Sequence, residues 1–118
     1  MSTRAPRDRI LDILDTIAEV QQFIADMTFD QFQADQRTLK AVMADFVIMG
    51  EAAGHIPDEL TDQHTTVPWA VMRAMRNRMV HVYFSVSPQI LWDTIHNDLP
   101  SLINPLQQLL SELDDDSV

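Results

Sequence analysis

The segment DQRTLKAVMADFVIMGEAAGH, residues 35–55, decides the fold class. Its apolar residues recur three or four positions apart, which is the spacing of one buried face of an α-helix. Asp35 is suited to cap the start of a helix, and Pro57 stops the pattern at the other end. We therefore predict a helix that runs to about His55. Its apolar row is Leu39, Val42, Met43, Phe46, Val47 and Met49 or Gly50.

Gly50 interrupts the side chains of this row, and a glycine costs a helix about 1 kcal/mol relative to alanine. A second helix that approaches closely would compensate, because no side chain keeps the two backbones apart. We expect such a contact at Gly50.

The helical spacing continues through most of the chain, which contains only two glycines and few alternating apolar runs. At the N-terminal side we predict a helix from Pro6 to Ala25 whose acidic outer face is solvated. A short turn or helix follows at Met27–Ala34, with Thr28 as its cap.

After the central helix we expect a polar loop at Pro57–Val67. A third helix is predicted from Pro68-Trp69 to about Tyr83, because the apolar spacing resumes there.

Ser87 and Pro88 supply the cap and the first turn of the last helical stretch. Pro100 and Pro105 are expected to kink or interrupt that stretch, since each lacks an amide donor and crowds the preceding turn. The acidic tail at about 112–118 is expected to fray.

The length of 118 residues, with 46% hydrophobic and 22% charged residues, indicates a single globular domain over residues 1–118. We predict an all-α bundle of four or five helices. No apolar run approaches the roughly 20 residues of a membrane helix, and no signal peptide is expected. The absence of cysteine excludes disulfides, thiolate nucleophiles and cysteine-bearing zinc sites, and it is compatible with the cytoplasmic location that we expect.

The formal net charge of −10 opposes general binding to nucleic acid, which needs a positive field. The acidic residues are nevertheless unevenly distributed. The segment Gln63–Trp92 holds 30 residues without one carboxylate, and it contains Arg73, Arg76 and Arg78. An acidic chain with such a basic segment can bind an anion locally.

The third helix has an apolar and a polar face when its residues are projected at about 100° per residue. The face that we expect in the core holds Val71, Met72, Met75, Met79 and Val82. The opposite face holds Arg73, Arg76, Asn77 and His81, with the apolar Val80 among them. Arg76 and His81 point about 140° apart, so the arginine must reach round or a second chain must complete the site.

These residue types suit the cleavage of RNA by its own 2′-hydroxyl. A histidine can move a proton near neutral pH, and the planar fork of an arginine can bind a phosphate on which charge grows. Each also has an ordinary structural interpretation. A lone histidine is often a satisfied structural residue, surface arginines are usually solvated, and Tyr83 can be an aromatic at the rim of the core.

The segment Arg76–Tyr83, RNRMVHVY, resembles the Arg-x4-His-x-Tyr motif of HepT-like toxins, a branch of the HEPN ribonuclease superfamily. Two further segments resemble the same family in the same order. Met49–Ala53 is similar to its Gly-Glu-Ala helix, and Val67–Trp69 is similar to the segment before its motif helix.

The resemblance implies a HEPN-type bundle and a metal-independent ribonuclease that needs no cofactor. It implies a homodimer whose motif helices meet at one composite site, with Arg76 and His81 catalytic and Asn77 and Arg73 in support. It also implies a neighbouring minimal nucleotidyltransferase antitoxin, of the MntA type, that transfers AMP to Tyr83. A phosphate added there would occupy the positive charge that RNA needs.

A second interpretation is a non-catalytic helical module whose arginine face binds a nucleotide or the acidic surface of a protein partner. Glu51 is interpreted as a structural residue paired with an arginine such as Arg78. No metal is expected, because the spacing of the four histidines matches no zinc signature: His55, His64, His81 and His96.

Overall fold

The computed structural model describes residues 4–81 and 86–116, and every regular element in these ranges is a helix. The all-α prediction is therefore confirmed. The elements in chain order are α1 (Pro6–Ile24), α2 (Phe29–Ala34), α3 (Gln36–Gly54), α4 (Asp58–Gln63), α5 (Trp69–His81), α6 (Pro88–Asp93), the π-helix η2 (Thr94–Asp98) and α7 (Pro100–Asp116).

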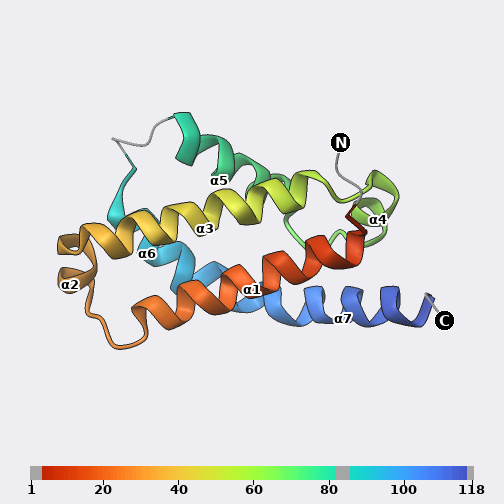
Figure 1. Ribbon diagram of the computed structural model, residues 1–118, viewed down its shortest axis with the longest axis horizontal. Coiled ribbons are helices and arrows are strands. Elements are labelled where there is room, and N and C mark those ends of the chain that lie inside the picture. Colours follow the sequence, from red (N-terminus) through yellow and green to blue (C-terminus); the bar gives the residue numbers. More distant parts are fainter. Residues whose placement is uncertain (1–3, 82–85, 117–118) are drawn as a thin grey trace.

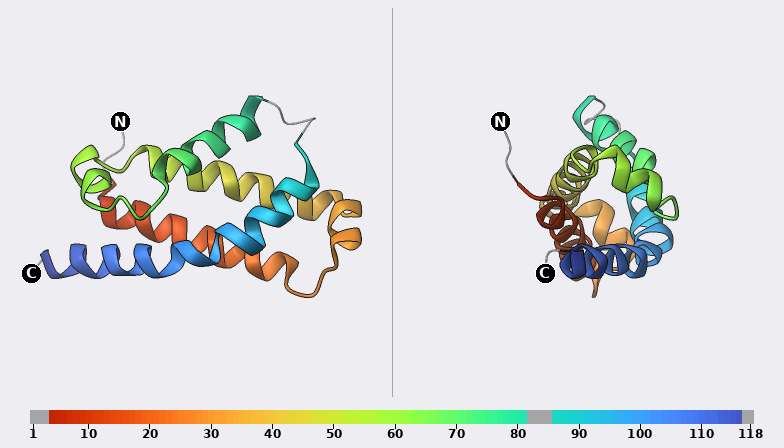
Figure 2. Two further views of the ribbon diagram at one scale, coloured as in Figure 1. Left: turned by 180° about the vertical axis from the view of Figure 1, so that it is seen from behind. Right: turned by 90° about the vertical axis from the view of Figure 1, so that its right-hand side faces the viewer.

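The long helices run along the 47 Å axis of the molecule, and α1 contacts both α3 and α7 (Figure 1). α5 packs on α3, while α2 contacts α6. Seen along the bundle, the helices surround a common apolar core (Figure 2). The face of α1 that the spacing assigns to the core is buried: Ile10, Ile13, Ile17, Val20 and Ile24. No helix within the described ranges is both long and apolar enough to cross a membrane.

Side-chain caps begin three of the helices at the predicted residues. The carboxylate of Asp35 accepts hydrogen bonds from the backbone N–H of Thr38 at 3.2 Å and from its hydroxyl at 2.9 Å, and both bonds lower the pKa of Asp35. Thr28 and Gln31 form a reciprocal capping box at α2. The hydroxyl of Ser87 caps α6. These caps satisfy amide donors that a helix start leaves without partners.

The polar segment 57–67, predicted as a loop, contains the short helix α4. Pro57 enters its first turn with the φ that a proline ring imposes, and Asp58 and Glu59 lie where carboxylates favour the helix dipole. These local signals outweigh the polarity of the segment, so the loop prediction is wrong for residues 58–63.

The two prolines of the last helical stretch have different effects. The π-helix η2 lies just before Pro100, and the N–H of Leu99 donates to the carbonyl of Thr94, five residues earlier, at 3.1 Å. The predicted interruption is therefore confirmed at Pro100. α7 runs through Pro105 without a break, so the predicted interruption is wrong at this residue, because the inner face of the helix is buried in the core. The buried residues of that face are Leu102, Leu106 and Leu109.

The acidic C-terminal stretch is helical as far as Asp116, so the prediction of a frayed tail is wrong for residues 112–116. Glu112 accepts a hydrogen bond from the ring of His64 at 2.7 Å, and Arg7 donates to the carboxylate of Asp114. Contacts from two other elements thus hold the last turns of α7.

One carboxyl group lies inside the bundle, at the contact of α3 with α1. Asp45 is only 4% exposed, and its Oδ2 atom is buried without a hydrogen-bond partner. Burial, together with the neighbouring carboxyl of Glu19, raises the pKa of Asp45 to about 7. Below about pH 7 the folded chain therefore favours the protonated form of Asp45.

This carboxyl makes stability depend on pH. An aspartate in the unfolded chain has a pKa of about 3.9, so between roughly pH 4 and 7 the folded chain binds more protons and its stability falls as the pH rises. We predict that Asp45→Asn raises the melting temperature at pH 8 by on the order of 5 °C, and that the gain disappears near pH 4. Thermal unfolding of both proteins across this range measures the effect, with Asp15→Asn on the exposed face of α1 as the control. An equal gain at pH 4 and pH 8 would contradict it.

Candidate active site

α3 and α5 meet backbone to backbone at Gly50. A Cβ atom built on Gly50 would lie 2.2 Å from the Cβ of Arg76 and 2.7 Å from the carbonyl oxygen of Met72. No residue with a side chain fits at these distances. The expected close approach of a helix at Gly50 is confirmed, and the approaching helix is α5.

The second glycine of the chain lies one turn further along α3 and faces the same helix. A Cβ atom on Gly54 would lie 3.8 Å from the Cδ of Arg73, which is ordinary van der Waals distance. The aliphatic part of Arg73 therefore lies over Gly54. α5 therefore packs on α3 at both glycines, Gly50 and Gly54. This contact positions the two arginines of α5 that face α3, Arg73 and Arg76.

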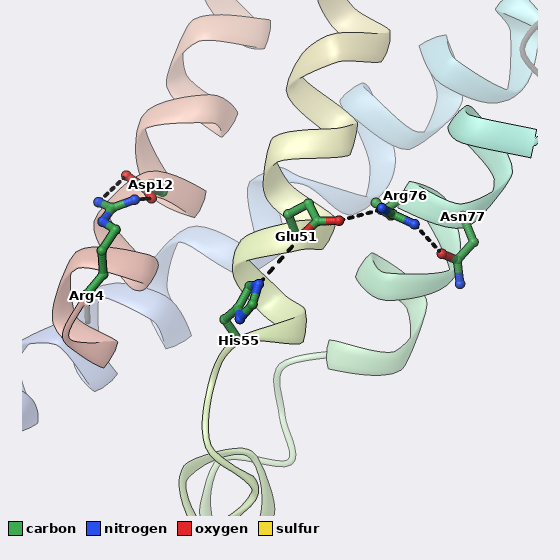
Figure 3. Close-up of polar contacts among 6 residues, drawn as sticks. All are labelled: Arg4, Asp12, Glu51, His55, Arg76 and Asn77. Carbon is green, nitrogen blue, oxygen red and sulfur yellow. Dashed lines mark hydrogen bonds and ion pairs between the residues drawn. The ribbon is translucent and has the colours of Figure 1, made fainter. Parts of the chain in front are cut away.

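Arg76 is fixed at this contact by groups from both helices. Its Nε atom is buried and lies 2.6 Å from Oε1 of Glu51, as an ion pair and not a linear hydrogen bond. Its Nη1 atom donates a hydrogen bond to Oδ1 of Asn77 at 3.1 Å. Figure 3 shows the guanidinium between these two residues. The side chain is 34% exposed, so solvent reaches part of it while Nε stays covered.

Glu51 has a second basic neighbour on its own helix. The Nε2 atom of His55 lies 3.7 Å from Oε2 of Glu51, and both side chains are about half exposed. The two carboxylate oxygens therefore face different partners, His55 and Arg76 (Figure 3). The result is a short row of polar groups that crosses from the end of α3 to the middle of α5.

The prediction that Glu51 pairs with an arginine is confirmed, but the partner is Arg76 and not Arg78, because Arg76 is the residue that Gly50 brings against α3. Arg76 does not lie opposite the apolar face of its helix, so that prediction is wrong. It follows the buried Met72 by one turn, and so it lies at the edge of that face beside α3. Gly50 next to Glu51 was the signal that could have indicated the pair.

The apolar face of α5 is also narrower than predicted. Met72 and Met79 are buried and Met75 is partly buried, but Val71 is 61% exposed. Val71 lines an open cavity of about 490 Å³ between α3, α5 and the start of α7. Its assignment to the core is wrong, because the helices leave this corner unfilled.

The remaining predicted site residues are placed to different extents. Arg73 is partly buried beside Gly54, and Asn77 is exposed and bonded to Arg76. His81 is the last residue of α5, and its side chain lies outside the part of the chain that the structure describes. Tyr83 lies outside the described residues. The structure thus brings Arg76 and Asn77 together, and the roles of His81 and Tyr83 stay predictions.

His64 has a structural role in the described part of the chain. Its Nδ1 atom lies 2.9 Å from the carbonyl of Leu60, and its Nε2 atom lies 2.7 Å from Glu112. Both acceptors favour the charged ring, so they raise the pKa of His64. Within residues 4–81 and 86–116, no three acidic, histidine or cysteine residues gather as a metal-binding group.

A family model described as Ribonuclease HepT-like matches residues 13–109, which include the whole contact between α3 and α5. The chain belongs to this family. The matched HepT-like region covers Gly50, Glu51, Arg76 and Asn77. It also covers His81 and Tyr83 of the motif.

Proteins named as ribonucleases are similar to this HepT-like chain over nearly its whole length. "Probable ribonuclease HepT" of Thermococcus cleftensis is 34% identical over 106 residues, 90% of this chain and 96% of the relative. "Putative RNase MJ0127" of Methanocaldococcus jannaschii is 31% identical over 114 residues, 97% and 94% of the two chains. "Putative RNase TTE0752" of Caldanaerobacter subterraneus is 28% identical over 109 residues, 92% and 97% of the two chains. No solved structure matches this chain.

Proposed function

We propose that this chain is a metal-independent RNA endonuclease of the HepT-like family. The observation that carries the proposal is the guanidinium of Arg76, which is held at two of its nitrogens and is still 34% exposed. An arginine fixed in this way is prepared to bind a phosphate before the substrate arrives. Relatives that carry ribonuclease names support RNA as the substrate.

The proposed reaction uses the 2′-hydroxyl of the RNA as the nucleophile. His81 takes the proton of that hydroxyl, and the 2′-oxygen bonds to the adjacent phosphorus. The bond from phosphorus to the 5′-oxygen breaks, and the departing 5′-oxygen takes up a proton from water. The products are a 2′,3′-cyclic phosphate and a 5′-hydroxyl end. Arg76 stabilises the charge on the phosphoryl oxygens, and Arg73 adds positive charge one turn away. Asn77 holds the guanidinium in place. No metal or cofactor enters this scheme.

The proposed active form is a homodimer in which two α5 helices face each other. At about 100° per residue, positions 76 and 81 of a helix are separated by about 140°, so a second copy can supply the group that one chain turns away. Val80 is 47% exposed between them, which is suited to a contact between subunits.

The proposed biological setting is a cytoplasmic toxin–antitoxin pair. A minimal nucleotidyltransferase antitoxin of the MntA type would transfer AMP from ATP to the hydroxyl of Tyr83, with release of pyrophosphate. The added phosphodiester would repel the RNA backbone and compete for the arginines of the site.

RNA cleavage in the presence of EDTA tests the proposed activity. We predict that the wild-type chain cuts single-stranded or tRNA-like RNA in EDTA and leaves 2′,3′-cyclic phosphate ends, and that His81→Ala lowers the rate by at least about 100-fold. His96→Ala is the control, since that ring bonds the carbonyl of Trp92 on another element. Intact RNA with both proteins would contradict the proposal. Binding of nucleotide that survives His81→Ala and is lost in Arg76→Ala would instead favour the non-catalytic module.

Mass spectrometry tests the proposed modification. Incubation with the cognate nucleotidyltransferase and ATP should add the mass of one AMP group per chain, and Tyr83→Phe should abolish the addition. Each chain contains a single tyrosine, so the position follows directly. AMP found on Tyr83→Phe would refute this assignment.

A further inference from the structure

The geometry points to Glu51 as a positioning residue that holds Arg76 ready for an anionic substrate, with His55 supporting the carboxylate from the other side. The inference deepens the proposed function and rests on it where catalysis is concerned. The sequence alone assigned Glu51 an ordinary structural role with a different arginine.

The first argument is that the pair has little freedom. Gly50 fixes the backbone of α5 against α3, and Glu51 is the next residue of α3. The Nε atom of Arg76 therefore emerges beside the carboxylate, where it is buried 2.6 Å from Oε1. A surface ion pair usually loses much of its energy to the ordering of two long side chains, but here the backbone contact has already limited one of them.

The second argument is the shape of the guanidinium. Arginine binds a phosphate through a flat fork of N–H groups, so the direction of the plane decides whether the fork faces the ligand. Glu51 holds Nε, and Asn77 accepts a hydrogen bond from Nη1 at 3.1 Å. Two contacts at different nitrogens fix the plane. The Arg76 side chain is still 34% exposed, so the guanidinium can donate to a substrate.

The third argument is that Glu51 is itself held. One oxygen faces Arg76 and the other faces Nε2 of His55 at 3.7 Å, as Figure 3 shows. At 3.7 Å the imidazole is too far away for a hydrogen bond, and it forms an ion pair with Glu51 only when its ring is protonated. His55 can therefore act on Arg76 only through Glu51.

A role in folding and a role in positioning predict different results. The side chains of Arg76 and Glu51 are 34% and 45% exposed, so the loss of their ion pair should change stability little. The loss of a fixed guanidinium plane should instead lower the rate of the chemical step, because small errors in the position of a catalytic group are costly.

The experiment compares Glu51→Ala, which removes the contact, with Glu51→Gln, which keeps an oxygen at the same reach. The first readout needs no turnover: the ¹⁵N–¹H signal of the Arg76 Nε–H group, assigned with Arg76→Lys. We expect a distinct signal with slow solvent exchange in the wild type, an averaged signal in Glu51→Ala and an intermediate result in Glu51→Gln, which keeps an oxygen but loses the charge of the ion pair. Glu59→Ala on α4 is the matched control and should leave the signal unchanged.

The second readout is the cleavage of RNA. We expect Glu51→Ala to lower kcat about tenfold with little change in KM, Glu51→Gln to restore only part of kcat, and melting temperatures to stay within about 3 °C of the wild type. An Arg76 signal that Glu51→Ala does not move would overturn the inference. If the signals change as expected but the wild type cuts no RNA, the proposed function fails and the holding of Arg76 stands.

Discussion

The contact between Gly50 and Arg76 is the constraint on which the site depends. Two helix backbones can approach this closely only where one of them carries no side chain, and the Cβ of Arg76 occupies the space that a residue at position 50 would need. The same contact decides which side chains meet. Because α5 cannot slide or rotate on α3 at this point, Glu51 faces the Nε atom of Arg76. The packing of α5 on α3 therefore also positions the charged groups of the candidate site.

Much of the fold could be predicted from the sequence because its signals are local. The apolar spacing of α1 and α3, the caps Asp35 and Thr28, and the close contact at Gly50 each depend on a few neighbouring residues. The predictions that are wrong concern features that depend on tertiary packing. Whether Pro105 interrupts a helix depends on how firmly the rest of that helix is buried, and packing of α7 in the core decides it.

The candidate site was predictable in its residue types more than in its contacts. An arginine in a segment without carboxylates predicts anion binding, which stays a prediction. In the structure Arg76 is partly exposed to solvent and pairs with the carboxylate of Glu51 on α3. Its partner could not be read from the spacing, since Glu51 belongs to another helix and the pairing needs the register of α5 on α3. The chain has a net charge of −10, and Glu51 supplies the carboxylate that pairs with Arg76. This pairing explains how Arg76 can be half-buried while part of its side chain stays exposed.

Thermal unfolding of the two glycine variants tests this account most directly. Gly50 lies in the interior of α3, where alanine gains about 1 kcal/mol of helix propensity over glycine, and Gly54 is the last residue of that helix, where the gain is smaller. The larger difference between the two substitutions is therefore what the new Cβ meets. The account predicts that Gly50→Ala lowers the melting temperature by on the order of 10 °C, because α5 must move away, whereas Gly54→Ala leaves it unchanged or raises it. Equal melting temperatures for the two variants would contradict the close contact of α3 with α5.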